Sequence, residues 1–185
     1  MGITIQPAPE SVRQTVLSNM WLEDADDLTN DSAQPGVGSQ MVTYPLYTAD
    51  LTAVLNRTFL STARQTAWLT TVVNGEMRTL TEVTSADTFM SMQFDDVTAA
   101  FLEGVKAAKA LDPVKKATYE FRIVRAPELY FIGIWLHKND DDLLMPVRPA
   151  PSGLQPGSVL REEQLMDILT PLAEIRLHTN DRTAS

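Results

Sequence analysis

The chain has 185 residues, the size of a single domain, and 44% of them are apolar while 21% are charged. This composition excludes a collagen-like chain, a coiled coil and a mostly disordered protein. The absence of cysteine excludes disulfide scaffolds, thiolate metal sites and cysteine nucleophiles. The net charge of −9 disfavours nucleic acid and anionic lipid surfaces as partners.

We expect a single domain over residues 1–185, with flexible ends at 1–9 and 176–185. The first residues lack the basic and apolar regions of a signal peptide. No stretch approaches the ~20 consecutive apolar residues of a membrane-spanning helix, so no membrane partner is expected. The sequence therefore predicts a soluble, cytoplasmic protein.

The first predicted element is a helix that begins near Ser11, which suits an N-cap, and ends in the acidic run 23–27. A loop follows over 30–40, where a proline and two glycines indicate turns. Residues 41–47 have the pattern of an extended segment with a proline, which favours an edge or irregular strand. Residues 48–64 fit either a helix or a broken strand.

The clearest local signal is a β-hairpin. The apolar run Trp68–Val73 leads into Asn74-Gly75 and returns as an alternating segment over Met77–Val83. Asn-Gly suits a type I′ turn because both residues tolerate positive φ. A helix is predicted next, since apolar residues recur at helical spacing over Val97–Leu111 and Asp112-Pro113 ends the pattern.

A second hairpin is predicted from Thr118–Val124 and Leu129–His137, joined around Pro127. Its second strand is apolar at nearly every position, which favours a central strand covered on both faces or a strand that faces a partner. A last helix begins near Arg161 and is strained or ended by Pro171.

These elements predict an α+β fold: an antiparallel sheet built from two β-hairpins, with about three helices packed mainly on one face. A doubly wound parallel sheet is the weaker alternative, because the strongest connections are tight turns rather than crossovers.

The sequence offers little for catalysis. It has two histidines, His137 and His178, and it lacks a Gly-x-Ser-x-Gly elbow, a P-loop and a dinucleotide-binding glycine motif. The run Asp140–Asp142 offers oxygen ligands for a hard cation, yet its spacing does not fit a calcium loop, and a solvated acidic turn is the favoured interpretation. We therefore predict no catalytic, cofactor-binding or metal-binding residues, and a carboxylate- or metal-dependent enzyme is the least favoured alternative.

One segment departs from the acidic character of the chain. Between positions 106 and 125 six basic residues face two acidic ones, a local charge of six minus two, or +4. Residues 23–31, in contrast, hold five acidic residues and no basic one. This asymmetry predicts docking of a protein partner or of a second copy, with an ordinary mixed surface as the alternative. The predicted interaction patch is Lys106, Lys109, Lys115, Lys116, Arg122 and Arg125.

Large aromatic residues offer a second candidate site. An apolar pocket between the sheet and its helices is predicted to be lined by Phe101, Phe121, Phe131 and Trp135. The sequence thus favours a non-enzymatic protein–protein interaction or accessory module. The alternative is a domain that binds a small apolar ligand in this pocket.

Overall fold

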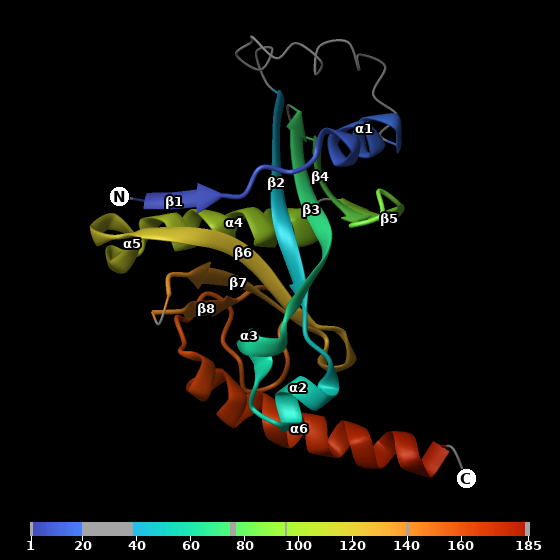
Figure 1. Ribbon diagram of the computed structural model, residues 1–185, viewed down its shortest axis with the longest axis vertical. Helices are drawn as coiled ribbons and strands as arrows, with labels where there is room; N and C mark the ends of the chain where they lie inside the picture. Colours follow the sequence, from blue (N-terminus) through green and yellow to red (C-terminus); the bar gives the residue numbers. More distant parts are fainter. Residues whose placement is uncertain (1, 20–38, 75–76, 95, 140, 184–185) are drawn as a thin grey trace.

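The computed structural model describes residues 2–19, 39–74, 77–94, 96–139 and 141–183. Its strands form one mixed sheet in the order β5-β4-β3-β2-β6-β7-β8, and β1 also pairs with β6 (Figure 1). In this view β2 and β3 run nearly vertically while β7 and β8 run nearly horizontally, so the sheet is strongly twisted.

The strands are β1 (Gly2–Ile5), β2 (Ser39–Thr48), β3 (Arg64–Asn74), β4 (Met77–Thr84), β5 (Phe89–Phe94), β6 (Thr118–Ala126), β7 (Phe131–His137) and β8 (Leu143–Pro146). The helices are α1 (Glu10–Asn19), α2 (Leu51–Leu55), α3 (Phe59–Thr62), α4 (Asp96–Ala110), α5 (Asp112–Lys116) and α6 (Glu162–Thr183), with a 3₁₀ turn η2 (Pro127–Leu129). The α+β class predicted from the sequence is confirmed.

The prediction of a purely antiparallel sheet is wrong. Strand β6 pairs in parallel with β1, where Ile3 faces Tyr119, and in parallel with β2, where Leu46 faces Ile123. The remaining neighbours are antiparallel. Parallel neighbours need a long crossover, and here the described chain between β2 and β6 forms three strands and four helices.

Helices cover both faces of the sheet, which corrects the prediction of packing mainly on one face. On one face α4 and α5 bury Phe101 and Val105 against strand residues such as Ile134. On the other face α1 covers the β3–β4 end, and α2, α3 and α6 cover the β6–β8 end. In Figure 1, α4 passes behind β2 and β3. Both faces need cover because successive residues of the central strands are apolar.

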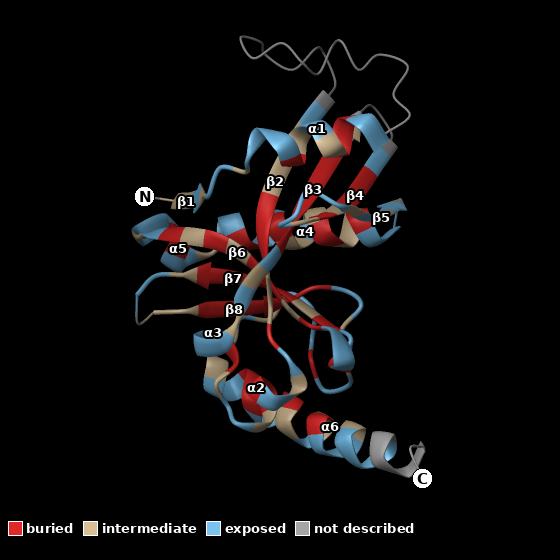
Figure 2. Cartoon of the chain, turned by 45° about the vertical axis from the view of Figure 1, so that its right-hand side comes forward, coloured by how far each residue is buried: buried red, intermediate tan, exposed pale blue. Residues whose placement is uncertain are grey.

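Strand β7 illustrates this double burial. It lies between β6 and β8, and Figure 2 shows β7 and β8 buried along most of their length. Ile134 points into the core under α4, whereas Trp135 points into the core under α6. This arrangement fits the first of the two interpretations of its apolar sequence, a central strand covered on both faces.

Strands β3 and β4 are antiparallel neighbours in the register Trp68 with Val83, and β6 and β7 are antiparallel neighbours joined through η2. Gly75 of the expected tight turn lies outside the described residues. The ambiguous segment 48–64 forms the end of β2, then α2 and α3, then the start of β3. Asp50 caps α2, since its carboxylate accepts the N–H of Ala53 at 2.8 Å.

The last helix, α6, continues through Pro171 to Thr183 and so does not end at the proline. Proline has no N–H to donate to the carbonyl four residues earlier, at Asp167. Because Pro171 is exposed, water can bind that carbonyl instead. The ends predicted as flexible contain β1 and the last turns of α6, and their mobility stays a prediction.

The acidic segment 23–31 lies outside the described residues. Across the residues that the structure describes, none of the helices combines the length and the apolar composition needed to cross a membrane.

Candidate functional site

A cavity of about 330 Å³ lies between the sheet and α4. Its floor is apolar, because neighbouring strands turn leucine side chains toward Phe101 of the helix. The floor residues are Leu46, Leu69, Leu80, Phe101, Phe131 and Ile132. The volume falls at the lower end of the range found for small-molecule sites, about 300–1,000 Å³.

Two arginines and one glutamate also line this cavity, giving it a charge of two minus one, or +1. Arg125 holds Glu82 in a fork: Nη1 donates to Oε2 at 2.8 Å and Nη2 lies 2.8 Å from Oε1. The remaining Nε of Arg125 donates to the Thr48 hydroxyl at 3.1 Å. Arg148, in contrast, is exposed and forms no ion pair with any described residue. Arg125 is therefore already paired with a carboxylate, whereas Arg148 is available to a ligand.

Tyr130 lies at the edge of the cavity in an unusual backbone conformation. Its φ of 53° is left-handed, a conformation that costs a bulky side chain about 1 kcal/mol or more. The side chain is 75% exposed, so burial of the ring offsets little of this cost. Backbone strain of this kind concentrates at binding sites and active sites.

The structure brings together two of the four residues predicted for an apolar pocket. Phe101 and Phe131 line the cavity. Phe121 is buried on the same face but packs against the ring of Tyr44, with ring centroids 5.0 Å apart, and does not reach the cavity. Trp135 lies on the opposite face from Ile134, because successive residues of a strand point to opposite sides. Phe131 has the same parity as Trp135, so its ring packs on that face against Phe59, while the residue lines the end of the cavity next to η2.

The predicted basic patch does not form one surface. Lys106 and Lys109 on α4 and Lys115 and Lys116 on α5 are exposed on neighbouring helices. Arg122 and Arg125 are three positions apart on β6 and therefore point to opposite faces of the sheet. The two lysines of α4 also line a second hollow, of about 250 Å³, over β2 and β3.

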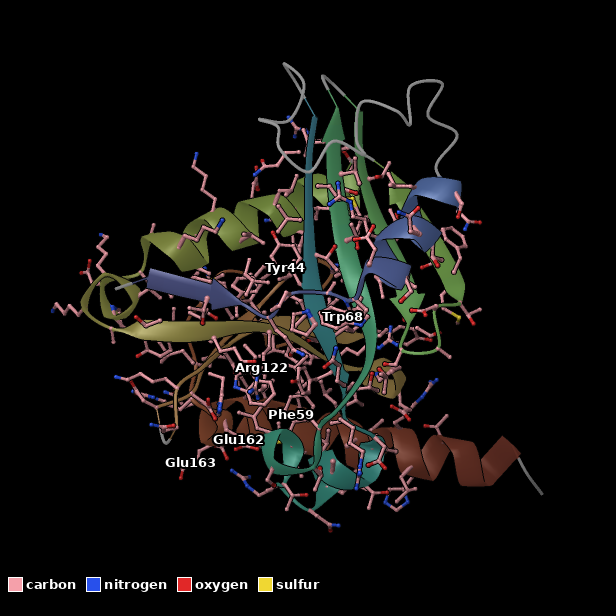
Figure 3. All side chains as sticks on the ribbon, turned by 45° about the horizontal axis from the view of Figure 1, so that its top comes forward. Tyr44, Phe59, Trp68, Arg122, Glu162 and Glu163 are labelled. Atoms are coloured by element: carbon pink, nitrogen blue, oxygen red, sulfur yellow. The ribbon has the colours of Figure 1, made fainter. Side chains whose placement is uncertain are left out.

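Arg122 belongs to a structural cluster under α3 and α6. It donates from Nε and Nη2 to Glu120 at 2.9 and 2.7 Å, and its guanidinium lies 5.0 Å from the ring centre of Tyr47 and 4.6 Å from that of Trp135. These hydrogen bonds hold the pKa of Glu120 below its usual value. Figure 3 shows Arg122 on the side of the sheet where Phe59 of α3 lies.

The acidic turn is tied to its surroundings by its own carboxylates. Asp141 accepts hydrogen bonds from the Tyr119 hydroxyl and from Arg161, each at 2.5 Å, and Asp142 lies 2.7 Å from Nδ1 of His137. Burial, followed by the bond to Asp141, raises the pKa of Tyr119 to about 12. Asp140 lies outside the described residues, among which no three acidic, histidine or cysteine side chains are placed to hold a metal ion.

Sequence reasoning missed Glu82, Tyr130 and Arg148. Tyr130 was assigned to a strand over Leu129–His137, whereas η2 includes Leu129, the strand begins at Phe131 and Tyr130 lies at the corner between them. The ion pair of Glu82 with Arg125 joins β4 to β6. The two residues are far apart in the chain, so the spacing of residues in the sequence could not predict this pair.

Comparison with known protein families, with curated proteins and with solved structures finds no match. The geometry of the cavity is therefore the observation from which a function can be inferred.

Proposed function

We propose that the protein binds a small molecule with an apolar body in the cavity between the sheet and α4. The observation that carries the proposal is the cavity itself: about 330 Å³, with an apolar floor and with Arg148 and Tyr130 at its edge. Each methylene group that a ligand buries there contributes about 0.8 kcal/mol to its affinity.

The test uses N-phenyl-1-naphthylamine, an uncharged dye whose fluorescence rises in apolar sites. Val97 lies in the first turn of α4, lines the cavity and is 37% exposed, so Val97→Trp should occupy the cavity without disturbing the core. Val159→Trp is the matched control, because Val159 is 40% exposed and does not line the cavity.

We expect saturable binding of one dye per chain to the unchanged protein and to Val159→Trp. Val97→Trp should weaken binding by about tenfold or more, which corresponds to the loss of one or two buried methylene contacts. No saturable binding, or equal binding by all three proteins, would contradict the proposal.

Docking of a protein partner is a second candidate. It rests on four exposed lysines of the consecutive helices α4 and α5, Lys106, Lys109, Lys115 and Lys116. Reversing all four to glutamate should abolish any stoichiometric partner seen in native mass spectrometry of the protein purified from its source. A partner that survives this change binds elsewhere.

A further inference from the structure

We infer that the ligand of the cavity carries one anionic group, a carboxylate, sulfonate or phosphate ester, and that Arg148 is the counter-ion of this group. This inference rests on the proposed function and adds the chemical class of the ligand. It follows from the sign of the charge in the cavity, from the state of the two arginines and from the groups at the edge.

The sign of the charge is the first argument. The chain as a whole carries −9, yet the cavity lining carries two arginines against one glutamate. A low-dielectric pocket concentrates the field of its own charged groups, so its local sign decides which ligands it attracts. A positive cavity in an acidic protein favours an anion and disfavours a cation.

The partners of the two arginines decide which of them meets the anion. Arg125 already donates to both carboxylate oxygens of Glu82, and both side chains are less than a third exposed, at 27% and 16%. An incoming anion at Arg125 would leave the Glu82 carboxylate unpaired in a poorly hydrated place, which is costly. Arg148 has no such partner among the described residues, so an anion gains a charge-assisted hydrogen bond there without breaking one.

The backbone beside Arg148 is held in place. Val147, the preceding residue, is buried and donates its N–H to the carbonyl of Ile132 at 3.1 Å. Val147 and Ile132 both line the cavity. The root of the Arg148 side chain is therefore fixed at the wall, while its flexible end can turn toward a bound ligand.

Groups next to Tyr130 add to the positive field. The guanidinium of Arg176 on α6 lies 5.9 Å from the centre of the Tyr130 ring. The Nε of Arg176 is buried and has no hydrogen-bond partner within the described residues. A further cation, in addition to the two arginines of the lining, therefore lies next to Tyr130 at the edge of the cavity.

The experiment compares two dyes with one skeleton. 8-Anilinonaphthalene-1-sulfonate carries the ring system of N-phenyl-1-naphthylamine and adds one sulfonate. The unchanged protein should bind the sulfonate more tightly, and salt should weaken only that dye. Arg148→Gln should weaken binding of the sulfonate by about tenfold, or 1.4 kcal/mol, and leave the uncharged dye unaffected.

Lys116→Gln is the control, because it removes the same charge from an exposed position on α5 and should leave the affinity for both dyes unchanged. Arg148→Lys should retain part of the preference for the sulfonate. If the uncharged dye binds but Arg148→Gln leaves the preference intact, the inference fails and the proposed function stands. If neither dye binds saturably, the proposed function fails.

Two further anions test whether the apolar part of the ligand is aliphatic or aromatic. Decanoate and 1-naphthoate are titrated against the bound sulfonate dye, each beside its uncharged methyl ester. Displacement by either acid more strongly than by its ester supports the inference and identifies the preferred body. Failure of both acids to exceed their esters overturns it.

Discussion

Arg122 and Arg125 show how three positions on one strand separate two similar residues. Arg122 points to the face covered by α3 and α6 and pairs with Glu120, whereas Arg125 points to the face covered by α4 and pairs with Glu82. Both arginine side chains are mostly buried, so each needs its carboxylate. Removal of one partner from such a pair leaves an uncompensated charge, which costs more than the intact pair contributes.

Glu82→Gln should therefore lower the free energy of unfolding by about 1–3 kcal/mol, because Arg125 loses its charged acceptor in a partly buried site. Asp112→Asn is the matched control, since it removes the same charge from the exposed pair with Lys115 and should cost less than about 0.5 kcal/mol. Urea unfolding at pH 7 measures both. Equal stability of the two variants would show that the Glu82–Arg125 fork contributes nothing.

Asp141 gives a prediction in acid. The Tyr119 hydroxyl, followed by Arg161, lowers the pKa of Asp141 below its usual 3.8. A folded pKa below the unfolded one adds stability above the unfolded value, and this stability is lost as the pH falls through the folded value. The stability advantage of the unchanged protein over Asp141→Asn should thus be constant above about pH 5 and shrink below pH 3.8. Urea unfolding between pH 7 and pH 3 measures it, and an advantage that grows in acid would contradict the assignment.

At the scale of elements, β7 packs tightly because one of its residues has no side chain. A Cβ on Gly133 would lie 2.9 Å from the ring tip of Phe131 and 3.2 Å from the backbone carbonyl oxygen of Met145 on β8. The ring of Phe131 thus lies over its own strand on the face covered by α3 and α6, where it packs against Phe59 with ring centroids 5.8 Å apart. Gly104 on α4 differs, because its nearest neighbour is the flexible end of Ile134 at 3.3 Å.

Gly133→Ala should lower the free energy of unfolding by about 1–3 kcal/mol, since the carbonyl oxygen of a paired strand cannot move away. Gly104→Ala should be close to neutral, because the gain in helix propensity of about 1 kcal/mol offsets the tighter contact. Thermal unfolding of both variants checks the difference. A Gly133→Ala protein as stable as Gly104→Ala would contradict the tight packing of β7.

At the scale of the molecule, β6 organises the sheet. One edge of β6 pairs with β1 over residues 118–121 and with β2 over residues 123–125, and the other edge pairs with β7. The cavity lies beside this junction, where Arg125 of β6 meets Glu82 of β4 across the two intervening strands.

Local patterns in the sequence predicted the α+β class, because helical spacing and strand alternation are properties of neighbouring residues. They could not predict the order of the strands. Gly2–Ile5 is too short to show a pattern, and its parallel pairing with β6 joins segments far apart in the chain. The sequence therefore predicted an antiparallel sheet covered by helices mainly on one face. The structure has a mixed sheet covered by helices on both faces.

The candidate site divides in the same way. Phe101 and Phe131 could be predicted because large apolar residues on core-facing elements line apolar pockets. Glu82, Tyr130 and Arg148 could not, because β4, the η2 corner and the segment after β8 meet only in the finished fold. The six basic residues do not form a single surface, because Arg122 and Arg125 are close in sequence but point to opposite faces of β6.

The pairing of β1 with β6 has a consequence for the time course of synthesis. Residues 2–5 leave the ribosome long before their partners at 118–121, which are made 118 − 2, or 116, residues later. Until then the first strand has no neighbour to accept its backbone hydrogen bonds. Strand β1 must therefore wait for β6 before it can pair, and the closure of such a long loop is a step that slows folding.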